Sequence, residues 1–263
     1  MKGMKLMGVD VGFSQKREAT GIACLDGHKL HLSKAGTAWE CRRGRIPAGF
    51  RPSVIALDGP LLPQGVNELV RRRCEFLFTY APFSKRCKPG LGHWGMGLEL
   101  RRAAAEACAQ FGQLLDDPTP SPREVSVSCD GPIVEAFPNA FLAVLMPEEE
   151  FRSSPKLKRG KRFDWLYNRA VVNNEYVKSS LSTAIDLPVE VWCQLSAETD
   201  HDRRAALVCL LSAALAAQGT ASTVGDAEGG WFWLPPFSLW QDWAREGLSR
   251  AAAKWRARTQ GGS

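Results

Sequence analysis

Two aspartates end short apolar segments in closely similar settings. Asp10 closes the first such segment, over residues 5–11, and Asp58 closes the segment 53–58, directly before Gly59-Pro60. Both segments have the length and the aliphatic content of buried strands. Parallel strands bring their carboxyl ends to one edge of a sheet, where ligands bind in α/β proteins. We therefore expect the two carboxylates to lie close together at that edge.

Two carboxylates in such a position need compensation. Like charges 4 Å apart repel by about 4 kcal/mol at an effective dielectric of 20. The pair therefore shares a proton, which raises one pKa, or binds a cation. Mg²⁺ is often held by one or two carboxylates together with substrate phosphates. The pattern favours a Mg²⁺ or Mn²⁺ site at Asp10 and Asp58. The alternative is that each carboxylate only caps the glycine-containing turn that follows it.

Two further acids are expected at the same sheet edge. Glu135 lies near the end of an apolar segment, 132–137, and Asp202 lies at the start of a long Ala-rich segment, 200–217. Asp is also favoured at helix N-termini for structural reasons, so Asp202 has a second interpretation. The four acids together predict a catalytic cluster, in which Asp10, Asp58 and Asp202 bind the metal.

The elements expected around these acids alternate between strand and helix. Strands are predicted over 5–11, 20–25, 29–32, 53–58 and 132–137, with a turn at Asp26-Gly27; helices are predicted over 67–79, 98–115 and 200–217. A helical insertion over about 139–191 precedes the last core helix, and a C-terminal helix covers about 239–258. A chain of 263 residues fits one α/β domain, 1–263, with this insertion.

The composition bounds the class of protein. Hydrophobic residues make up 44% of the chain and charged residues 24%, as in ordinary globular proteins. We find no apolar stretch of the roughly 20 residues needed to span a membrane, and no apolar secretion signal at the start. These features predict a cytoplasmic protein without a membrane partner.

Basic residues are concentrated in three segments, 71–88, 151–163 and 245–258, although the net charge is only +6. Basic segments around an acidic remainder suit a protein that grips phosphates and holds a cation elsewhere. Nucleic acid of unspecified type is the expected partner, and the candidates to hold its backbone are Lys16, Arg17, Arg71, Arg72 and Arg73. The alternative is ordinary solvated surface charge.

Six short motifs follow one another along the chain. They are Gly8-Val-Asp-Val-Gly-Phe-Ser14, Ala56-Leu-Asp-Gly-Pro60, Arg73-Cys-Glu75, Glu135-Ala-Phe-Pro138, His201-Asp202 before the Ala-rich helix, and Gly225-Asp-Ala-Glu-Gly-Gly-Trp231 continuing to Pro235. In this order and spacing they resemble the predicted nuclease family called domain of unknown function 429, which is similar to RNase H-like enzymes, including Holliday-junction resolvases. The resemblance spans nearly the whole chain.

The resemblance implies an RNase H-like fold, a mixed sheet flanked by helices. It also implies metal-binding acids on the first strand, the fourth strand and the last core helix, which correspond to Asp10, Asp58 and Asp202, with Glu135 nearby. The implied activity is metal-dependent hydrolysis of phosphodiester bonds, in which metal activates water and stabilises the leaving oxygen.

The chain departs from the family pattern after Asp202. The pattern often has another Asp two or three residues later, where this chain has Arg203, Arg204 and Ala205. A complete two-metal site would need Asp200 or Glu135 as a substitute. One alternative is therefore a nucleic-acid-binding or scaffold protein with a degenerate site. Another is an actin-like or sugar-kinase-like ATP-binding protein, which the turn 9–14 and Thr20-Gly21 would fit.

Overall fold

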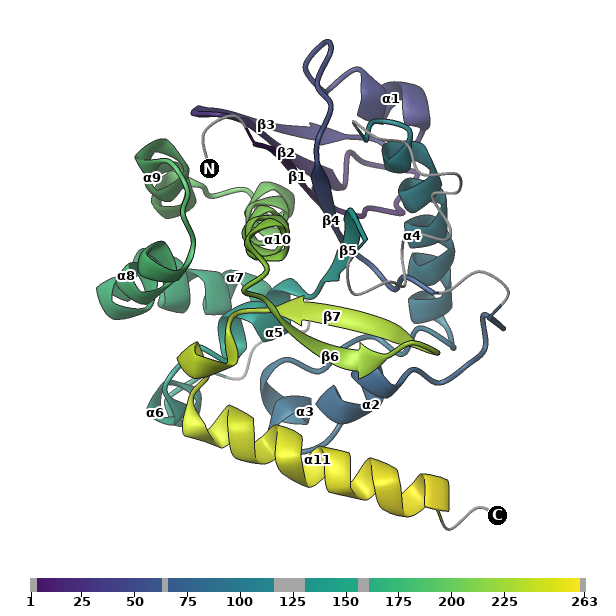
Figure 1. Ribbon diagram of the computed structural model, residues 1–263, viewed down its shortest axis with the longest axis vertical. Coiled ribbons are helices and arrows are strands. Elements are labelled where there is room, and N and C mark those ends of the chain that lie inside the picture. Colours follow the sequence, from purple (N-terminus) through teal and green to yellow (C-terminus); the bar gives the residue numbers. More distant parts are fainter. Residues whose placement is uncertain (1–3, 63–65, 116–130, 156–160, 261–263) are drawn as a thin grey trace.

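The chain forms an α/β fold around one mixed sheet of seven strands in the order β3-β2-β1-β4-β5-β7-β6 (Figure 1). The computed structural model describes residues 4–62, 66–115, 131–155 and 161–260. The pairs β1–β4, β4–β5 and β5–β7 are parallel, whereas β1–β2, β2–β3 and β6–β7 are antiparallel. The strands are β1 (Lys5–Asp10), β2 (Thr20–Asp26), β3 (Lys29–Ala35), β4 (Val54–Asp58), β5 (Ile133–Ala136), β6 (Ser222–Asp226) and β7 (Gly230–Leu234).

Helices cover both faces of the sheet, with α10 on one face and α4 on the other (Figure 1). The helices are α1 (Trp39–Arg43), α2 (Arg73–Phe78), α3 (Phe83–Arg86), α4 (Met96–Gly112), α5 (Pro138–Ala143), α6 (Glu148–Arg152), α7 (Arg162–Tyr167), α8 (Glu175–Ala184), α9 (Val189–Ala197), α10 (His201–Gln218) and α11 (Asp242–Gln260). A π-helical turn, Asn168–Val172, and a 3-10 turn, Phe237–Leu239, complete them. None of these helices is long and apolar enough to cross a membrane.

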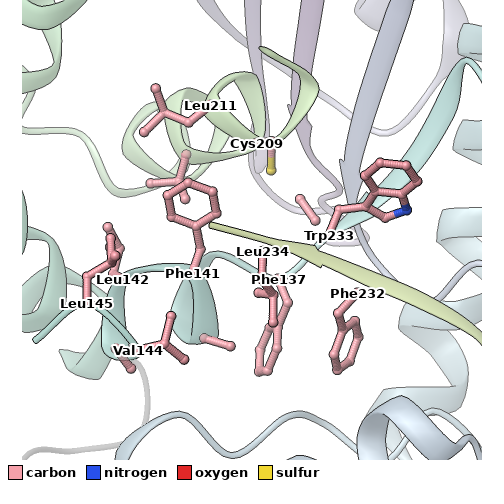
Figure 2. Packing of buried hydrophobic residues seen from close by; sticks show 14 of the residues in the cluster. Phe137, Phe141, Leu142, Val144, Leu145, Cys209, Leu211, Phe232, Trp233 and Leu234 are labelled. Atoms are coloured by element: carbon pink, nitrogen blue, oxygen red, sulfur yellow. The ribbon is translucent and has the colours of Figure 1, made fainter. Parts of the chain in front are cut away.

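The central strands are apolar on both faces, which is why they are covered twice. On β1, Leu6 belongs to the cluster under α10, while Met7 and Val9 belong to the cluster under α4. Figure 2 shows Cys209 and Leu211 of α10 in the same apolar cluster as residues from α5 and β7. The alternation of side chains along each strand therefore decides which helix a given residue faces.

Two glycines let α10 lie directly on the sheet. A methyl group on Gly8 would overlap the backbone of Ala206 and Leu210, and one on Gly21 would overlap the carbonyl group of Asp202. This close approach places the first turn of α10 over the end of β1. The glycines thus determine where Asp202 lies relative to Asp10.

Several predicted elements are confirmed with shifted ends. The hairpin turn comes one residue later than expected, because Asp26 pairs with Lys29 around Gly27-His28 and Gly27 has a φ of 59°. The segment predicted as insertion is helical, from α5 to α9, and extends to Ala197. The last helix starts at Asp242 instead of 239. The predicted helix 67–79 is wrong in its first half, because only Arg73–Phe78 is helical and Arg72 is extended.

Candidate active site

Asp10 and Asp58 are neighbours in the parallel ladder of β1 and β4, and each is the last residue of its strand. Neighbouring strands lie about 4.8 Å apart, and residues in register point to the same face. That face is the one covered by α10, since Gly8, two residues before Asp10, contacts this helix. The two acids expected to meet at the sheet edge therefore do so.

The electrostatics of this pair disfavour two bare charges. Burial raises the pKa of Asp10 well above its ordinary value, and the charges of Asp58 and Asp202 raise it further, against the effect of Arg17 and Lys34. Burial, with the charge of Glu135, raises the pKa of Asp58 to about 7. Both side chains nevertheless keep part of their surface open. Near neutral pH the pair either retains protons or accepts a cation.

A lysine not singled out in the sequence lies in the same row of the sheet. Lys34 of β3 pairs with Gly21 of β2, and Gly21 pairs in turn with Asp10. Because Gly21 has no side chain, Lys34 reaches over it, and its Nζ lies 2.7 Å from Oδ2 of Asp202. The sequence pattern does not indicate Lys34, because the predicted strand ends at residue 32, whereas β3 continues to Ala35. Counting the hairpin pairing outward from its two-residue turn would have placed it opposite Gly21.

Asp202 lies in the first turn of α10 and is only 3% exposed. Besides Lys34, it has Arg17 as a partner, with Nη1 at 3.7 Å from Oδ2. Its charge reaches Asp10 and raises the pKa of that carboxyl group. Asp202 therefore joins the site from the helix side, as expected, but its charge is already matched by Lys34.

Asp200 acts as the N-cap of α10. Its Oδ1 accepts hydrogen bonds from the backbone N–H groups of Asp202 and Arg203, both at 3.1 Å. Its Oδ2 lies 3.0 Å from Nζ of Lys34. Although burial opposes it, the contacts with Arg203 and Lys34 hold the pKa of Asp200 below its ordinary value. These contacts give Asp200 a structural role and not that of a substitute metal ligand.

The two arginines after Asp202 have partners that do not belong to the group formed by Asp10, Asp58 and Lys34. Arg203 pairs with Glu198 at 3.0 Å, and Nε of Arg204 donates to the carbonyl oxygen of Glu198 at 2.7 Å. Asp164 accepts the second contact of Arg204, at 3.8 Å, and also pairs with Nδ1 of His201 at 3.0 Å. Arg203 and Arg204 thus have partners of their own, away from Asp10 and Asp58.

Glu135 lies on the other face of the sheet. It pairs in register with Leu57 and not with Asp58. Both of its oxygens are bound by the guanidinium of Arg72, one of them at 2.9 Å, and Oε2 also accepts the backbone N–H of Leu61 at 2.9 Å. Its charge still reaches Asp58. These contacts make Glu135 a neighbour of the site, and they do not support it as a metal ligand.

The predicted nucleic-acid contacts divide by exposure. Lys16, Arg17 and Arg71 are exposed, and Arg73 is half-buried. Arg72 is fully buried against Glu135 and Glu75, so the expectation that it holds a nucleic-acid backbone does not fit its position. Part of the basic segment 151–163 lies outside the described residues, at 156–160.

A cleft of about 830 Å³ opens beside Asp58 at the carboxyl ends of β4 and β5. Asp58, Glu135 and Phe137 line it at the strand ends, together with residues of the Gly-rich loop 88–95 and the first two residues of α4. This volume is within the usual range for ligand sites. Apart from the Gly and Pro content of that loop, no pattern in the sequence indicates the cleft.

The described residues contain no group of three or more His, Cys, Asp and Glu side chains arranged to hold a metal ion. The carboxylates available to a metal ion are therefore those of Asp10 and Asp58. The carboxylate of Asp202 is occupied by its ion pair with Lys34. Two carboxylates of raised pKa fit a hard divalent cation whose other ligands are water and phosphate oxygens.

Comparisons of the chain with protein-family models, with curated proteins and with solved structures find no match.

Proposed function

We propose that the protein is a metal-dependent nuclease of RNase H-like type, in which Asp10 and Asp58 hold Mg²⁺ or Mn²⁺. The observation that carries the proposal is the in-register pairing of the two acids at the carboxyl ends of β1 and β4. Burial and mutual repulsion make this pair costly as two bare anions. A divalent cation removes that cost, and the adjoining cleft gives a substrate access to Asp58.

The positions of the acids also support the RNase H-like assignment. The resemblance described above implies acids on the first strand, the fourth strand and the last core helix. Here Asp10 ends β1, Asp58 ends β4, and Asp202 lies in the first turn of α10. Three acids from separate parts of the chain thus occupy the implied elements in one molecule.

The residues of the site have different roles in the proposed reaction. The bound metal would supply a water activated for attack and stabilisation of the leaving oxygen. Asp10 and Asp58 lose their protons on binding it, so binding strengthens as pH rises. Arg17, whose side chain is exposed, provides positive charge beside Asp10, where it attracts a phosphodiester and stabilises the negative charge that develops during displacement. Asp202 holds Lys34 in place.

Cleavage of fluorescein-labelled DNA and RNA oligonucleotides with Mg²⁺ or Mn²⁺ tests this function. Asp10→Asn and Asp58→Asn should each lower the rate by about a hundredfold or more, since metal catalysis contributes several kcal/mol. Asp26→Asn is the matched control, because Asp26 is exposed and lies at the opposite end of β2 from the site. Cleavage that persists without metal, or in both site variants, would rule the proposal out.

A second candidate is a nucleic-acid-binding protein without catalysis. The ion pair between Lys34 and Asp202 favours it, because the ammonium group supplies part of the positive charge that a metal would bring. Under this alternative, labelled oligonucleotides bind but are not cut, and Mn²⁺ gives no saturable heat of binding.

A further inference from the structure

The cleft beside Asp58 carries an aromatic side chain that the proposed chemistry does not use. Trp94, on the Gly-rich loop 88–95, lines the cleft and is 76% exposed. Met96, two residues later, also lines it and is 65% exposed. Large apolar side chains this exposed usually mark a contact with a ligand or partner when they gather at a concave site.

The loop that carries Trp94 is fixed to the core. The backbone N–H of Gly92 donates to Oε2 of Glu75 at 3.0 Å, and Glu75 is buried against Arg72. A side chain on Gly92 would overlap Glu75, and one on Gly97 would overlap the carbonyl of Leu91. The indole is therefore presented on a backbone held in one position, which lowers the entropy lost when a ligand stacks on it.

Two cations line the same cleft. Lys88 is exposed, and Arg162, the first residue of α7, is half-buried. Among the described residues, neither forms an ion pair with a carboxylate. Their charges remain available to an anionic ligand, whereas most other arginines near the site are already paired. Among the residues that the structure describes, the carboxylates that line the cleft are those of Asp58, Glu75 and Glu135.

An exposed aromatic ring beside unpaired cations is the combination by which proteins bind single-stranded nucleic acid. Bases stack on the ring while Lys and Arg follow the phosphates. A cleft of about 830 Å³ has room for nucleotide units of one strand, whereas a duplex would have to lie across its mouth. A cation alone or an exposed ring alone would not indicate nucleic acid. Here the ring and the cations line one cleft together with Asp58, a candidate metal ligand.

We propose that this cleft binds unpaired nucleotides of a single strand, with a base stacked on Trp94 and phosphates on Lys88 and Arg162. That the strand then leads to the metal at Asp58 rests on the proposed nuclease function. Binding in the cleft does not, because none of its three contacts needs the metal. The substrate class is accordingly a strand with an unpaired segment, such as a single strand or a flap.

Fluorescence anisotropy with a labelled dT oligonucleotide in EDTA tests the binding separately from cleavage. Trp94→Ala should weaken binding by about tenfold or more, because stacking contributes roughly 1–3 kcal/mol per base. Trp94→Phe should retain most of the affinity. Tyr176→Ala is the matched control, since Tyr176 is 74% exposed and lies on α8, outside the cleft lining. A blunt hairpin duplex should bind more weakly than the single strand.

Equal affinity in the Trp94→Ala and Tyr176→Ala variants would overturn the inference, and so would tighter binding of the duplex. The failures are distinguishable. If metal-dependent cleavage occurs but Trp94 contributes nothing to binding, the proposed single-strand binding in the cleft is wrong and the proposed nuclease function stands. If binding depends on Trp94 but no cleavage occurs, the proposed nuclease function is wrong and the proposed single-strand binding in the cleft stands.

Discussion

Asp10 and Asp58 are direct partners in the parallel ladder between β1 and β4, so their side chains leave the sheet on the same face and at the same edge. Gly8 and Gly21 bring α10 onto that face, and Asp202 with it. The acids therefore belong to one site because of strand register and helix approach, and not because of any one short motif.

The first prediction concerns pH. Asp58 has a pKa near 3.8 in the unfolded chain and about 7 in the folded protein. The folded state thus binds more protons at Asp58 between these values, so the contribution of Asp58 to the free energy of unfolding falls as pH rises through this window and is constant above it. The loss is on the order of a few kcal/mol. Urea unfolding of the metal-free protein from pH 4 to pH 8 measures it. Asp58→Asn should make the profile less steep, while Asp10 and Glu135, whose pKa values burial also raises, still contribute. An unchanged slope would contradict this origin.

The second prediction concerns the ion pair of Lys34 and Asp202. Lys34→Met leaves a carboxylate that is 4% exposed without its nearest cation, and should lower the free energy of unfolding by about 1–3 kcal/mol. Asp202→Asn in the same background should recover part of that loss, giving a coupling of about 0.5–3 kcal/mol. Lys29→Met, an exposed position on the same strand, is the control. Strict additivity in the double-mutant cycle would show that the pair is not coupled.

The third prediction concerns the buried arginine under the cleft. Arg72 has no exposed side-chain surface and binds both oxygens of Glu135. Lysine cannot make that forked contact, so Arg72→Lys should destabilise the protein by about 3 kcal/mol or more. Arg71→Lys, one residue earlier and exposed, should change stability by less than about 0.5 kcal/mol. Similar melting curves for the two variants would argue against the buried pair.

The fourth prediction concerns the close approach of α10. Gly21→Ala introduces a methyl group that would overlap the carbonyl of Asp202, so α10 must shift, at a cost of about 1–3 kcal/mol. Because the shift moves Asp202 relative to Lys34 and Asp10, oligonucleotide cleavage should fall as well. Gly90→Ala meets no atom within 4 Å and should leave the melting temperature unchanged. A stable, fully active Gly21→Ala protein would show that the helix position is not critical.

Much of the fold could be predicted because the strands are short apolar runs with clear ends. The run that ends at Asp58 is stopped by Gly59-Pro60, and the hairpin is signalled by Gly27. The helix predicted over 67–79 is wrong in its first half, because a tertiary contact outweighs the local helix propensity there. Arg72 adopts an extended backbone and buries its guanidinium on Glu135, which is 63 residues away. No local pattern encodes such a distant partner.

Asp10, Asp58 and Arg17 of the site could be predicted from the sequence, whereas Lys34 and the position of Glu135 could not. Strand ends locate Asp10 and Asp58, but the face on which Glu135 lies depends on its pairing with Leu57, one position away from Asp58. A shift of one residue moves a side chain to the opposite face. Lys34 and Trp94 required the register of the hairpin and the path of a loop, and neither follows from composition.

Isothermal titration of the metal-free protein with Mn²⁺ at pH 8 tests the central claim most directly, because it measures occupancy of the carboxylate pair without any assumed substrate. Asp10 and Asp58 should give saturable binding that is lost in Asp10→Asn and in Asp58→Asn, kept in Asp26→Asn, and weakened at pH 6, where protons compete for the pair. Identical titrations for the wild type and the two site variants would contradict the account.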